Sequence, residues 1–322
     1  MQWQPTASLE TLRARARVLA EIRVFFAERN VLEVTTPALS PAGATDPNIA
    51  SFVTRPAATP DSRLYLHTSP EFAMKRLLAA GSGPIYQLCT VFRDSDSGRH
   101  HRPEFCMLEW YRPGFDYRRL MDEVELLVKT LAAPYRTIDS VRRLSYRRLF
   151  IDSLQLDPAA ATIGDCRACC GRYGLPVPEN MPESLDPWLD LLISSLVAPR
   201  LPPSALTFIY DYPASQAALA STKMVDDYAV AERFELYWGA VELANGFQEL
   251  TDPEEQLLRF KSDNIQRSAQ GIPEVAIDMA LIDALRAGLP DCAGVALGVD
   301  RLLMAILEAG HINEVIAFAD DP

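Results

Sequence analysis

Two acidic residues, Glu235 and Glu242, have the spacing of a paired carboxylate site. They lie in two predicted strands, 231–238 and 240–249, which are rich in Val, Leu, Phe and Tyr. If Trp238-Gly239 forms the hairpin loop, Glu235 stands opposite Glu242, with Cβ atoms about 5 Å apart. A divalent cation would relieve the repulsion, and Mg²⁺ typically sits on one or two carboxylates plus substrate phosphates. The pattern predicts a magnesium–nucleotide site, with two solvated carboxylates on an exposed edge as the alternative.

The second of these strands also carries groups suited to a small cation. Asn245, Phe247 and Glu249 share one face of a regular strand, and Glu242 lies on the other face. Gly246 marks either a bulge that changes the phase of the strand or a place where a ligand approaches the backbone. An acid beside an amide and an aromatic ring favours a small amine-bearing substrate.

A charged loop between two apolar strands predicts a phosphate contact. Residues 85–92 and 104–111 are typical of strands, and the loop 93–103 between them holds several cations. Arg93 leaves the end of the first strand, where a guanidinium can bind a phosphate through two hydrogen bonds. A solvated surface loop is the alternative interpretation of the same residues.

A second anion contact is predicted near the end of the chain. A strand of small apolar residues turns at Gly298 into a helix whose first turn carries Arg301. Backbone N–H groups, the helix dipole and the arginine would then point at one anion. The dinucleotide pattern GxGxxG and the phosphate-loop pattern GxxxxGK[ST] are both absent from the sequence.

The elements that carry these residues can be placed along the chain. Ser8 caps a predicted helix to about residue 30, and a strand over 31–36 stops at Pro37. This pair of elements fits either the core or a dimer seam. Ser69-Pro70-Glu71 opens a helix over 72–80, so Glu71 is explained either by helix capping or by a role in a pocket.

Length and composition limit the class of protein. The chain has 322 residues, 48% of them hydrophobic, and a net charge of −12. Such values are typical of a globular protein with one large domain or two modest ones, and the acidic balance argues against a broad nucleic-acid surface. The sequence contains no apolar run of about 18 residues and no signal-peptide pattern, so we expect a cytoplasmic protein without membrane contact.

A mostly helical insertion is predicted at about 145–204, without evident chemistry. Within it, a helix over 162–174 carries Cys166, Cys169 and Cys170. No fourth cysteine or histidine lies nearby to complete a zinc tetrahedron. We therefore expect these cysteines to be small buried residues.

Taken together, these stretches resemble the three motifs of a class II aminoacyl-tRNA synthetase core. The first helix and strand match motif 1, the dimer motif, residues 92–105 match motif 2, and residues 298–301 match motif 3. The segment ELANGFQEL, 242–250, resembles the lysine subclass. The resemblance covers nearly the whole chain, and it rests on the order and spacing of the motifs. It implies an α+β fold, an antiparallel sheet flanked by helices, in one catalytic domain over 1–322.

The absence of one domain of the synthetases before the core distinguishes between the families that the chain resembles. A lysyl-tRNA synthetase carries an anticodon-binding OB domain before its core, whereas here the motif 1 helix starts directly after Ser8. The chain is similar to the elongation factor P–lysine ligase family, stand-alone paralogues that attach (R)-β-lysine to that factor. The tracts LEWYRPGFDYRRLMDEV and PDCAGVALGVDRL look closest to this family. The resemblance thus implies no OB domain, a homodimer, elongation factor P as partner, and no use of tRNA.

The resemblance also implies an ATP site. Arg93 would hold the α-phosphate, Arg301 the γ-phosphate, and Phe105 would stack on adenine, while Gly298 would let the nucleotide approach the backbone. Glu235 and Glu242 would hold Mg²⁺. The implied nucleotide-binding set is Arg93, Asp94, Ser95, Arg102, Phe105, Glu242, Leu243, Gly298 and Arg301, with Arg93 and Arg301 as the catalytic pair. Ser95 replaces the family's usual adenine-contacting glutamate, with Asp96 next to it, and Arg102 replaces its usual asparagine.

The amino-acid pocket implied by the resemblance binds lysine or β-lysine. Glu71 would take the backbone-side amine, and Glu249 with Tyr111 the side-chain ammonium. The implied set is Ser69, Pro70, Glu71, Glu109, Tyr111, Asn245, Glu249 and Ala296. Ala296 stands where the synthetases usually have glycine, and its methyl group would favour the β-isomer by at most about 10–200-fold.

The expected activity is the ATP-dependent formation of an aminoacyl-adenylate, followed by transfer to a lysine ε-amine of elongation factor P. A truncated synthetase that charges tRNA, a small-molecule amide ligase and a non-catalytic paralogue are the alternatives. The presence of Arg93, Arg301 and both glutamates favours a catalyst.

Overall fold

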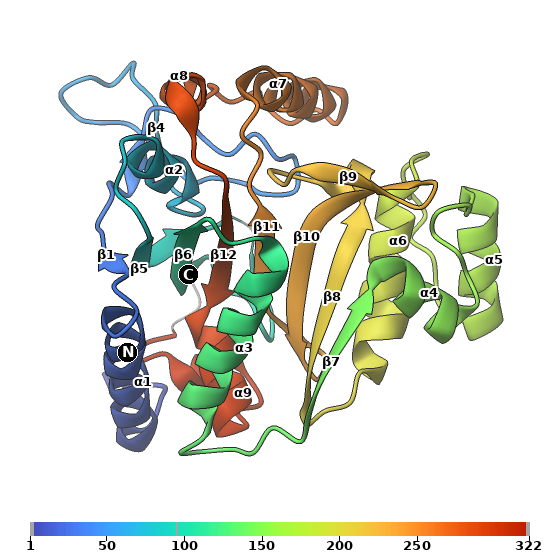
Figure 1. Ribbon diagram of the computed structural model, residues 1–322, viewed down its shortest axis with the longest axis horizontal. Coiled ribbons are helices and arrows are strands. Elements are labelled where there is room, and N and C mark those ends of the chain that lie inside the picture. Colours follow the sequence, from blue (N-terminus) through green and yellow to red (C-terminus); the bar gives the residue numbers. More distant parts are fainter. Residues whose placement is uncertain (1–2, 95, 320–322) are drawn as a thin grey trace. The chain divides into compact units, whose positions relative to one another are not determined.

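The structure is a computed structural model that describes residues 3–94 and 96–319. The chain divides into two compact units, which we describe separately (Figure 1). Unit 1 comprises residues 1–136 and 249–322, and unit 2 comprises residues 137–248. The insertion expected at 145–204 falls within unit 2. That both units act as one catalytic domain stays a prediction.

Unit 1 is built on strands β1 (Leu32–Glu33), β5 (Ile85–Phe92), β6 (Glu104–Pro113) and β12 (Cys292–Gly298), hydrogen-bonded in that order. β1 pairs with β5 in parallel, and the other neighbours are antiparallel. A separate small sheet has the order β2 (Leu39–Ser40), β4 (Leu64–Leu66), β3 (Val53–Thr54). The strand predicted over 31–36 is thus reduced to two residues, whereas β5 has the predicted bounds.

Unit 1 contains the helices predicted after Ser8, after Ser69-Pro70 and after Gly298. The helices of unit 1 are α1 (Leu9–Ala27), α2 (Glu71–Ala79), α3 (Tyr117–Ala132), α7 (Pro253–Ala269), α8 (Met279–Gly288) and α9 (Val299–Leu307), with a 3₁₀ turn at Ile312–Val315. Ser8 caps α1 as predicted, because its Oγ accepts a hydrogen bond from the Thr11 N–H at 3.0 Å. α3 packs on β12, and α2 packs against α8 (Figure 1). The helices therefore enclose the strands that carry the candidate site residues of unit 1.

Unit 2 has its own strands and its own helical layer. Strands β11 (Val241–Gln248), β10 (Tyr228–Trp238), β8 (Ala205–Pro213) and β7 (Ser140–Ser145) pair in that order, and β9 (Thr222–Val225) also pairs with β10. The helices are α4 (Tyr146–Leu154), α5 (Ile163–Tyr173) and α6 (Asp186–Leu192), followed by a π turn (Ile193–Val197) and short 3₁₀ turns at Ala198–Arg200 and Ala214–Gln216. These helices lie in the region 145–204; that this region is an insertion stays a prediction.

The core of unit 2 contains the three clustered cysteines. Cys166, Cys169 and Cys170 are buried together with Phe150 and Trp188. All three are free thiols, and burial raises the pKa of Cys166 to about 11. The prediction that they are buried structural residues is confirmed.

The hairpin between β10 and β11 corrects the predicted register. Trp238 pairs with Val241, so the loop is Gly239-Ala240 and not Trp238-Gly239. Gly239 has φ +55°, and a Cβ there would lie 3.1 Å from the Cα of Pro203. Glycine is therefore required at residue 239, which is the first residue of the observed loop.

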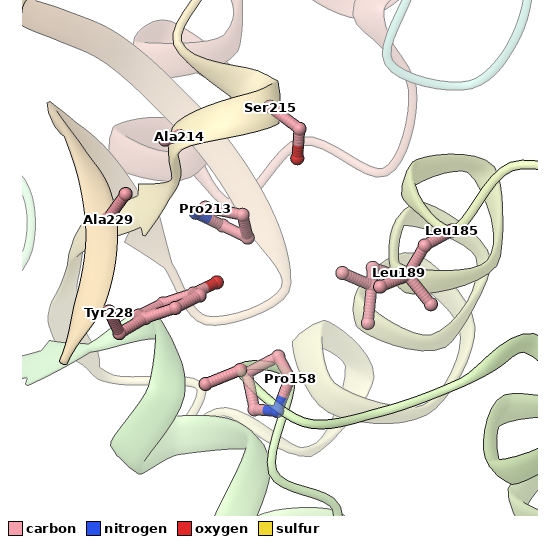
Figure 2. Close-up of a pocket in the computed structure, with 9 residues that line it drawn as sticks. Pro158, Leu185, Leu189, Pro213, Ala214, Ser215, Tyr228 and Ala229 are labelled. Atoms are coloured by element: carbon pink, nitrogen blue, oxygen red, sulfur yellow. The ribbon is translucent and has the colours of Figure 1, made fainter.

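A small cavity opens in unit 2, between the helical layer and the strands (Figure 2). Its volume is about 290 Å³, and its lining is mostly apolar. The lining residues are Pro158, Ala159, Leu185, Leu189, Pro213, Ala214, Ser215, Tyr228 and Ala229. The hydroxyl of Ser215 is already engaged, because it donates to Asp186 at 2.7 Å. No candidate site residue lines this cavity.

The α+β class expected from the sequence is confirmed: both units combine mainly antiparallel strands with helices. Within residues 3–94 and 96–319, no helix has the length and apolar character needed to cross a bilayer.

Candidate functional site

The strands of unit 1 bring several predicted pocket residues into register. Glu109 in β6 lies opposite Gln87 in β5 and opposite Ala296 in β12. Two residues further along β6, Tyr111 lies opposite Gly294. Since side chains alternate along a strand, Glu109 and Tyr111 project from the same face.

Glu109 is the centre of a buried hydrogen-bond network. Its Oε2 accepts from the Ser69 hydroxyl at 2.6 Å, and its Oε1 accepts from the Tyr111 hydroxyl at 2.7 Å. Ser69 also accepts from the Glu71 N–H at 3.0 Å and so supports the start of α2. Pro70 is the N-cap residue of that helix. Four of the predicted pocket residues, Ser69, Glu71, Glu109 and Tyr111, are thus joined by direct hydrogen bonds.

Lys75 in α2 joins two further acids. Its ammonium lies 2.7 Å from Oε1 of Glu71, one turn earlier in the helix, and 2.6 Å from Oε2 of Glu249. The side chains of Lys75 and Glu249 are each only 1% exposed, and that of Glu71 is 15% exposed. Both contacts are ion pairs at hydrogen-bonding distance. Lys75 is not among the predicted pocket residues, although its i, i+4 spacing from Glu71 can be read in the sequence.

Burial changes the acid–base properties of this cluster. Desolvation and the charge of Glu71 raise the pKa of Glu109 to about 8. Desolvation raises the pKa of Glu249 to about 7, although the charge of Lys75 opposes this shift. Burial by itself would lower the pKa of Lys75, but the charges of Glu249 and Glu71 raise it above its usual value. Glu71 and Glu249 contact the Lys75 ammonium and Glu109 lies beside them, so the cluster holds more carboxyl groups than cations, which suits a cationic ligand.

Gly294 completes the packing around the acids. A Cβ at this position would overlap the ring of Tyr111 and lie 2.5 Å from Oε1 of Glu249. Real Cβ atoms essentially never approach so closely. The absence of a side chain at residue 294 therefore lets Tyr111 and Glu249 lie against the backbone of β12.

The arginines predicted to bind phosphates lie on the ends of strands and helices in unit 1. Arg93 follows β5, and its guanidinium lies 5.3 Å from the centroid of the Phe105 ring. Arg301 is in the first turn of α9, and its Nε donates to the carbonyl of His100 at 3.1 Å. Burial and the positive charge of Arg99 lower the pKa of His100. This part of unit 1 is rich in cationic groups, as an anion site requires.

The other residues of unit 1 that are predicted to bind the nucleotide have varied surroundings. Arg102 donates to Asn313 at 3.1 Å and to the carbonyl of Ala319 at 3.3 Å. The N–H of the exposed Asp94 donates to the carbonyl of Ala50 at 2.8 Å. Gly298 lies at the N-terminus of α9, where a Cβ would meet only the Arg301 side chain at 3.7 Å or more. Ser95 lies outside the described residues.

Asp300 anchors the first turn of α9. It is 2% exposed, it accepts from the Cys106 N–H at 2.7 Å, and it forms an ion pair with Arg15 of α1. The residue next to Arg301 is therefore fixed to both β6 and α1.

In unit 2, Glu235 is fully engaged with donors. Its Oε1 pairs with Arg233 at 2.5 Å, and its Oε2 accepts from Tyr212 at 2.6 Å and from Tyr237 at 2.8 Å. Arg233 also donates to Asn245 at 3.1 Å. Arg233 is not among the predicted site residues. It shares a strand face with Glu235, because the two residues are two positions apart.

The predicted pairing of Glu235 with Glu242 is wrong. Glu235 stands opposite Asn245, and Glu242 stands opposite Tyr237. A bulge between Leu236 and Tyr237 shifts the register, not a bulge at Gly246. Together with the displaced loop, this bulge separates the two glutamates along the hairpin.

A metal between these two carboxylates does not fit the arrangement of unit 2. Both oxygens of Glu235 already take protein donors, and a cation would have to displace one of them. Glu242 is half-buried, and its neighbour Leu243 is buried. Among the described residues, no group of three His, Cys, Asp or Glu side chains has the geometry of a metal site.

Comparisons with known proteins agree with the motifs. The family described as "tRNA synthetases class II (D, K and N)" matches residues 1–322. A Yersinia enterocolitica protein named "Elongation factor P--(R)-beta-lysine ligase" is 50% identical over 319 residues, which cover 98% of this chain and 97% of that protein. Proteins of the same name from Salmonella typhi and Photobacterium profundum are 49% and 48% identical, respectively. Each match covers 99% of this chain and 98% of the relative. The resemblance seen in the sequence is confirmed.

Proposed function

The chain belongs to the class II tRNA synthetase family (D, K and N), and from this premise we propose that it is an ATP-dependent amino-acid ligase. Its substrate is (R)-β-lysine or lysine, which it activates as an adenylate and transfers to a lysine of elongation factor P. The names of its relatives support the acceptor and the amino acid. The observation that carries the proposal is the buried cluster of Glu71, Glu109 and Glu249.

The acidic cluster suits a diamino acid. Lysine and β-lysine each carry two ammonium groups, and a buried ammonium needs a carboxylate or other acceptors to offset its desolvation. Glu71 takes the amine near the substrate carboxylate, and Glu249 with Tyr111 takes the distal ammonium. Glu109 and Ser69 hold Tyr111 and the start of α2 in place.

The first chemical step needs positioning more than proton transfer. An oxygen of the substrate carboxylate, already ionised at neutral pH, attacks the α-phosphorus of ATP. A new oxygen–phosphorus bond forms, the bond to the β-phosphate oxygen breaks, and pyrophosphate leaves. Arg93 offsets the charge on the α-phosphate and Arg301 that on the γ-phosphate.

The second step forms the amide. The neutral ε-amine of the acceptor lysine attacks the carbonyl carbon of the adenylate, a carbon–nitrogen bond forms, and AMP leaves while the amine gives a proton to solvent. The acceptor amine has an ordinary pKa near 10.4, so docking must favour its neutral form.

Further parts of the proposal concern the metal, the assembly and the location. Glu242 is the carboxylate proposed to meet Mg²⁺ on the ATP phosphates, because Glu235 is held by three donors. A homodimer is proposed through α1 and β1, where Leu9 and Leu32 are 63% and 56% exposed. We place the enzyme in the cytoplasm, without tRNA or membrane contact.

A transfer assay tests the proposal. Radiolabelled (R)-β-lysine or lysine is supplied with ATP and Mg²⁺, in parallel, to purified elongation factor P and to total tRNA. We expect label on the factor, and none on a factor whose acceptor lysine is replaced by arginine. Label on tRNA alone would overturn the acceptor, and a failure to label either would overturn the transfer reaction.

Phosphate binding by Arg301 is tested by ATP–pyrophosphate exchange in the Arg301→Ala variant. Loss of one preorganised charge contact should lower the exchange rate by about 100-fold or more. Arg286→Ala is the matched control, because Arg286 forms exposed ion pairs on α8. An unchanged rate in Arg301→Ala would exclude the γ-phosphate role.

A further inference from the structure

Lys75 is a buried cation within a pocket proposed to bind cations. Its side chain is 1% exposed, and its single ammonium contacts Glu71 from the same helix and Glu249 from a distant part of the chain. An internal ammonium in such a place competes with a cationic substrate for negative charge. The presence of Lys75 therefore needs an explanation other than its contribution to the stability of the fold.

Stability alone gives a weak explanation. A buried ion cluster is often no more stable than apolar side chains of similar volume, because the charges lose their hydration. Methionine fits the space of lysine and is common in helices.

We propose that Lys75 is a positioning residue of the amino-acid pocket, which holds Glu71 and Glu249 at a fixed separation so that each meets one ammonium group of a diamino acid. The inference rests on the proposed function, because the roles of the two carboxylates come from there.

The geometry sets the limits of this separation. Oε1 of Glu71 and Oε2 of Glu249 contact the same nitrogen, so they cannot be farther apart than the sum of two short contacts. Without that nitrogen, two buried carboxylates would repel each other and move apart. Lys75 therefore fixes where the two ammonium groups of the substrate bind, and how far apart they lie.

The charge of Lys75 also favours the ionised form of Glu249. The groups that face Glu249 come from α2, β6 and β12, and they are Glu71, Lys75, Glu109, Tyr111 and Cys292. Lys75 is the cation of this set, and its charge lowers the pKa of Glu249. Removing the charge would raise the pKa of Glu249, so a larger fraction of the pocket would be protonated near neutral pH.

Kinetics of the Lys75→Met variant test the inference. ATP–pyrophosphate exchange with lysine or (R)-β-lysine is measured against pH, with both substrates varied. We expect KM for the amino acid to rise at least about tenfold, KM for ATP to stay within about twofold, and the acidic limb of kcat/KM to move to higher pH.

Lys129→Met is the matched control. Lys129 forms the same i, i+4 ion pair with a glutamate, also at 2.7 Å, but its side chain is 45% exposed. This variant should behave as the wild-type enzyme. If neither lysine nor (R)-β-lysine supported ATP–pyrophosphate exchange by the wild-type enzyme, the proposed function itself would be rejected, independently of any result with Lys75.

Two results would overturn the role of Lys75. One is an unchanged KM for the amino acid with an unchanged pH profile, and the other is an equal rise of KM for both substrates. If Lys75→Met does not fold, judged by loss of thermal stabilisation by ATP, Lys75→Arg is used. Arginine keeps the positive charge but places it at a different distance from Glu71 and Glu249. The acidic limb of kcat/KM should therefore stay at the wild-type pH, and KM for the amino acid should rise. A wild-type KM in that variant would reject the inference.

Discussion

Gly294 and Tyr111 face each other on neighbouring antiparallel strands, and the tyrosine ring occupies the space that a side chain at residue 294 would need. Glu249 approaches the same glycine, so both predicted contacts of the distal ammonium depend on one missing Cβ.

Gly294→Ala should therefore damage both stability and amino-acid binding. The ring and the carboxylate are buried, so relief of the overlap costs about 1–3 kcal/mol of unfolding free energy. Urea denaturation measures this loss, and exchange kinetics should show a raised KM for the diamino acid. Gly171→Ala in α5 is the control, because a Cβ there meets nothing within 4 Å. Wild-type values for Gly294→Ala would disprove the packing argument.

Gly298→Ala distinguishes an effect on protein stability from an effect on ATP binding. A Cβ at residue 298 would make only ordinary contacts with Arg301, so the variant should unfold at the wild-type urea concentration. If ATP lies against this part of the backbone, KM for ATP should rise several-fold while KM for the amino acid stays constant. An unaltered KM for ATP would show that the nucleotide does not approach Gly298.

The dependence of activity on pH should follow Glu249. Its pKa of about 7 means that the carboxylate, which attracts the ammonium, forms as the pH rises. We expect kcat/KM for lysine or β-lysine to increase between about pH 6 and 8. A pH-independent kcat/KM across this range would contradict the role of Glu249.

Stability should change with pH in the opposite direction. The pKa of Glu109 is raised from 4.5 in the unfolded chain to about 8 in the folded protein, so the folded protein binds the extra proton between these values. Its contribution to stability is complete below about pH 4.5 and is lost as the pH rises through about 8. Thermal melts of the wild type and of Glu109→Gln measure this, and the decline should be smaller in the variant.

The two hairpin glutamates should respond differently to neutralisation. Glu242→Gln should raise the Mg²⁺ concentration needed for half-maximal exchange by about 10-fold or more with little change in stability. Glu235→Gln removes the charged partner of Arg233 and should cost about 3–5 kcal/mol of unfolding free energy. Titrations with Mg²⁺ and with urea distinguish the two variants. Identical responses would refute the assignment of Glu242 to Mg²⁺ binding and of Glu235 to stability.

The arrangement of elements was predictable because hydrophobic periodicity and capping residues act locally. β5 and the cap of α1 by Ser8 follow directly from such patterns. The hairpin register was not predictable in this way. It depends on a bulge beside Tyr237, which no local pattern in the sequence marks.

In the candidate site, too, some residues could be predicted from the sequence and others depend on contacts that form only on folding. Family motifs identified Glu71, Glu109 and Glu249 by position, and the structure brings all three into one cluster in unit 1. Lys75 escaped notice because its significance comes from Glu249, which joins it only after folding. A buried lysine cannot be distinguished from a surface lysine on a helix by spacing alone.

The distribution of the free thiols makes the opening of each unit separately measurable. Cys166, Cys169 and Cys170 are buried in unit 2, whereas Cys89, Cys106 and Cys292 belong to unit 1. Buried thiols with raised pKa values react slowly with alkylating reagents until the surrounding structure opens. Pulsed alkylation followed by peptide mass spectrometry would therefore time local unfolding in both units of the unmodified enzyme, without any introduced probe.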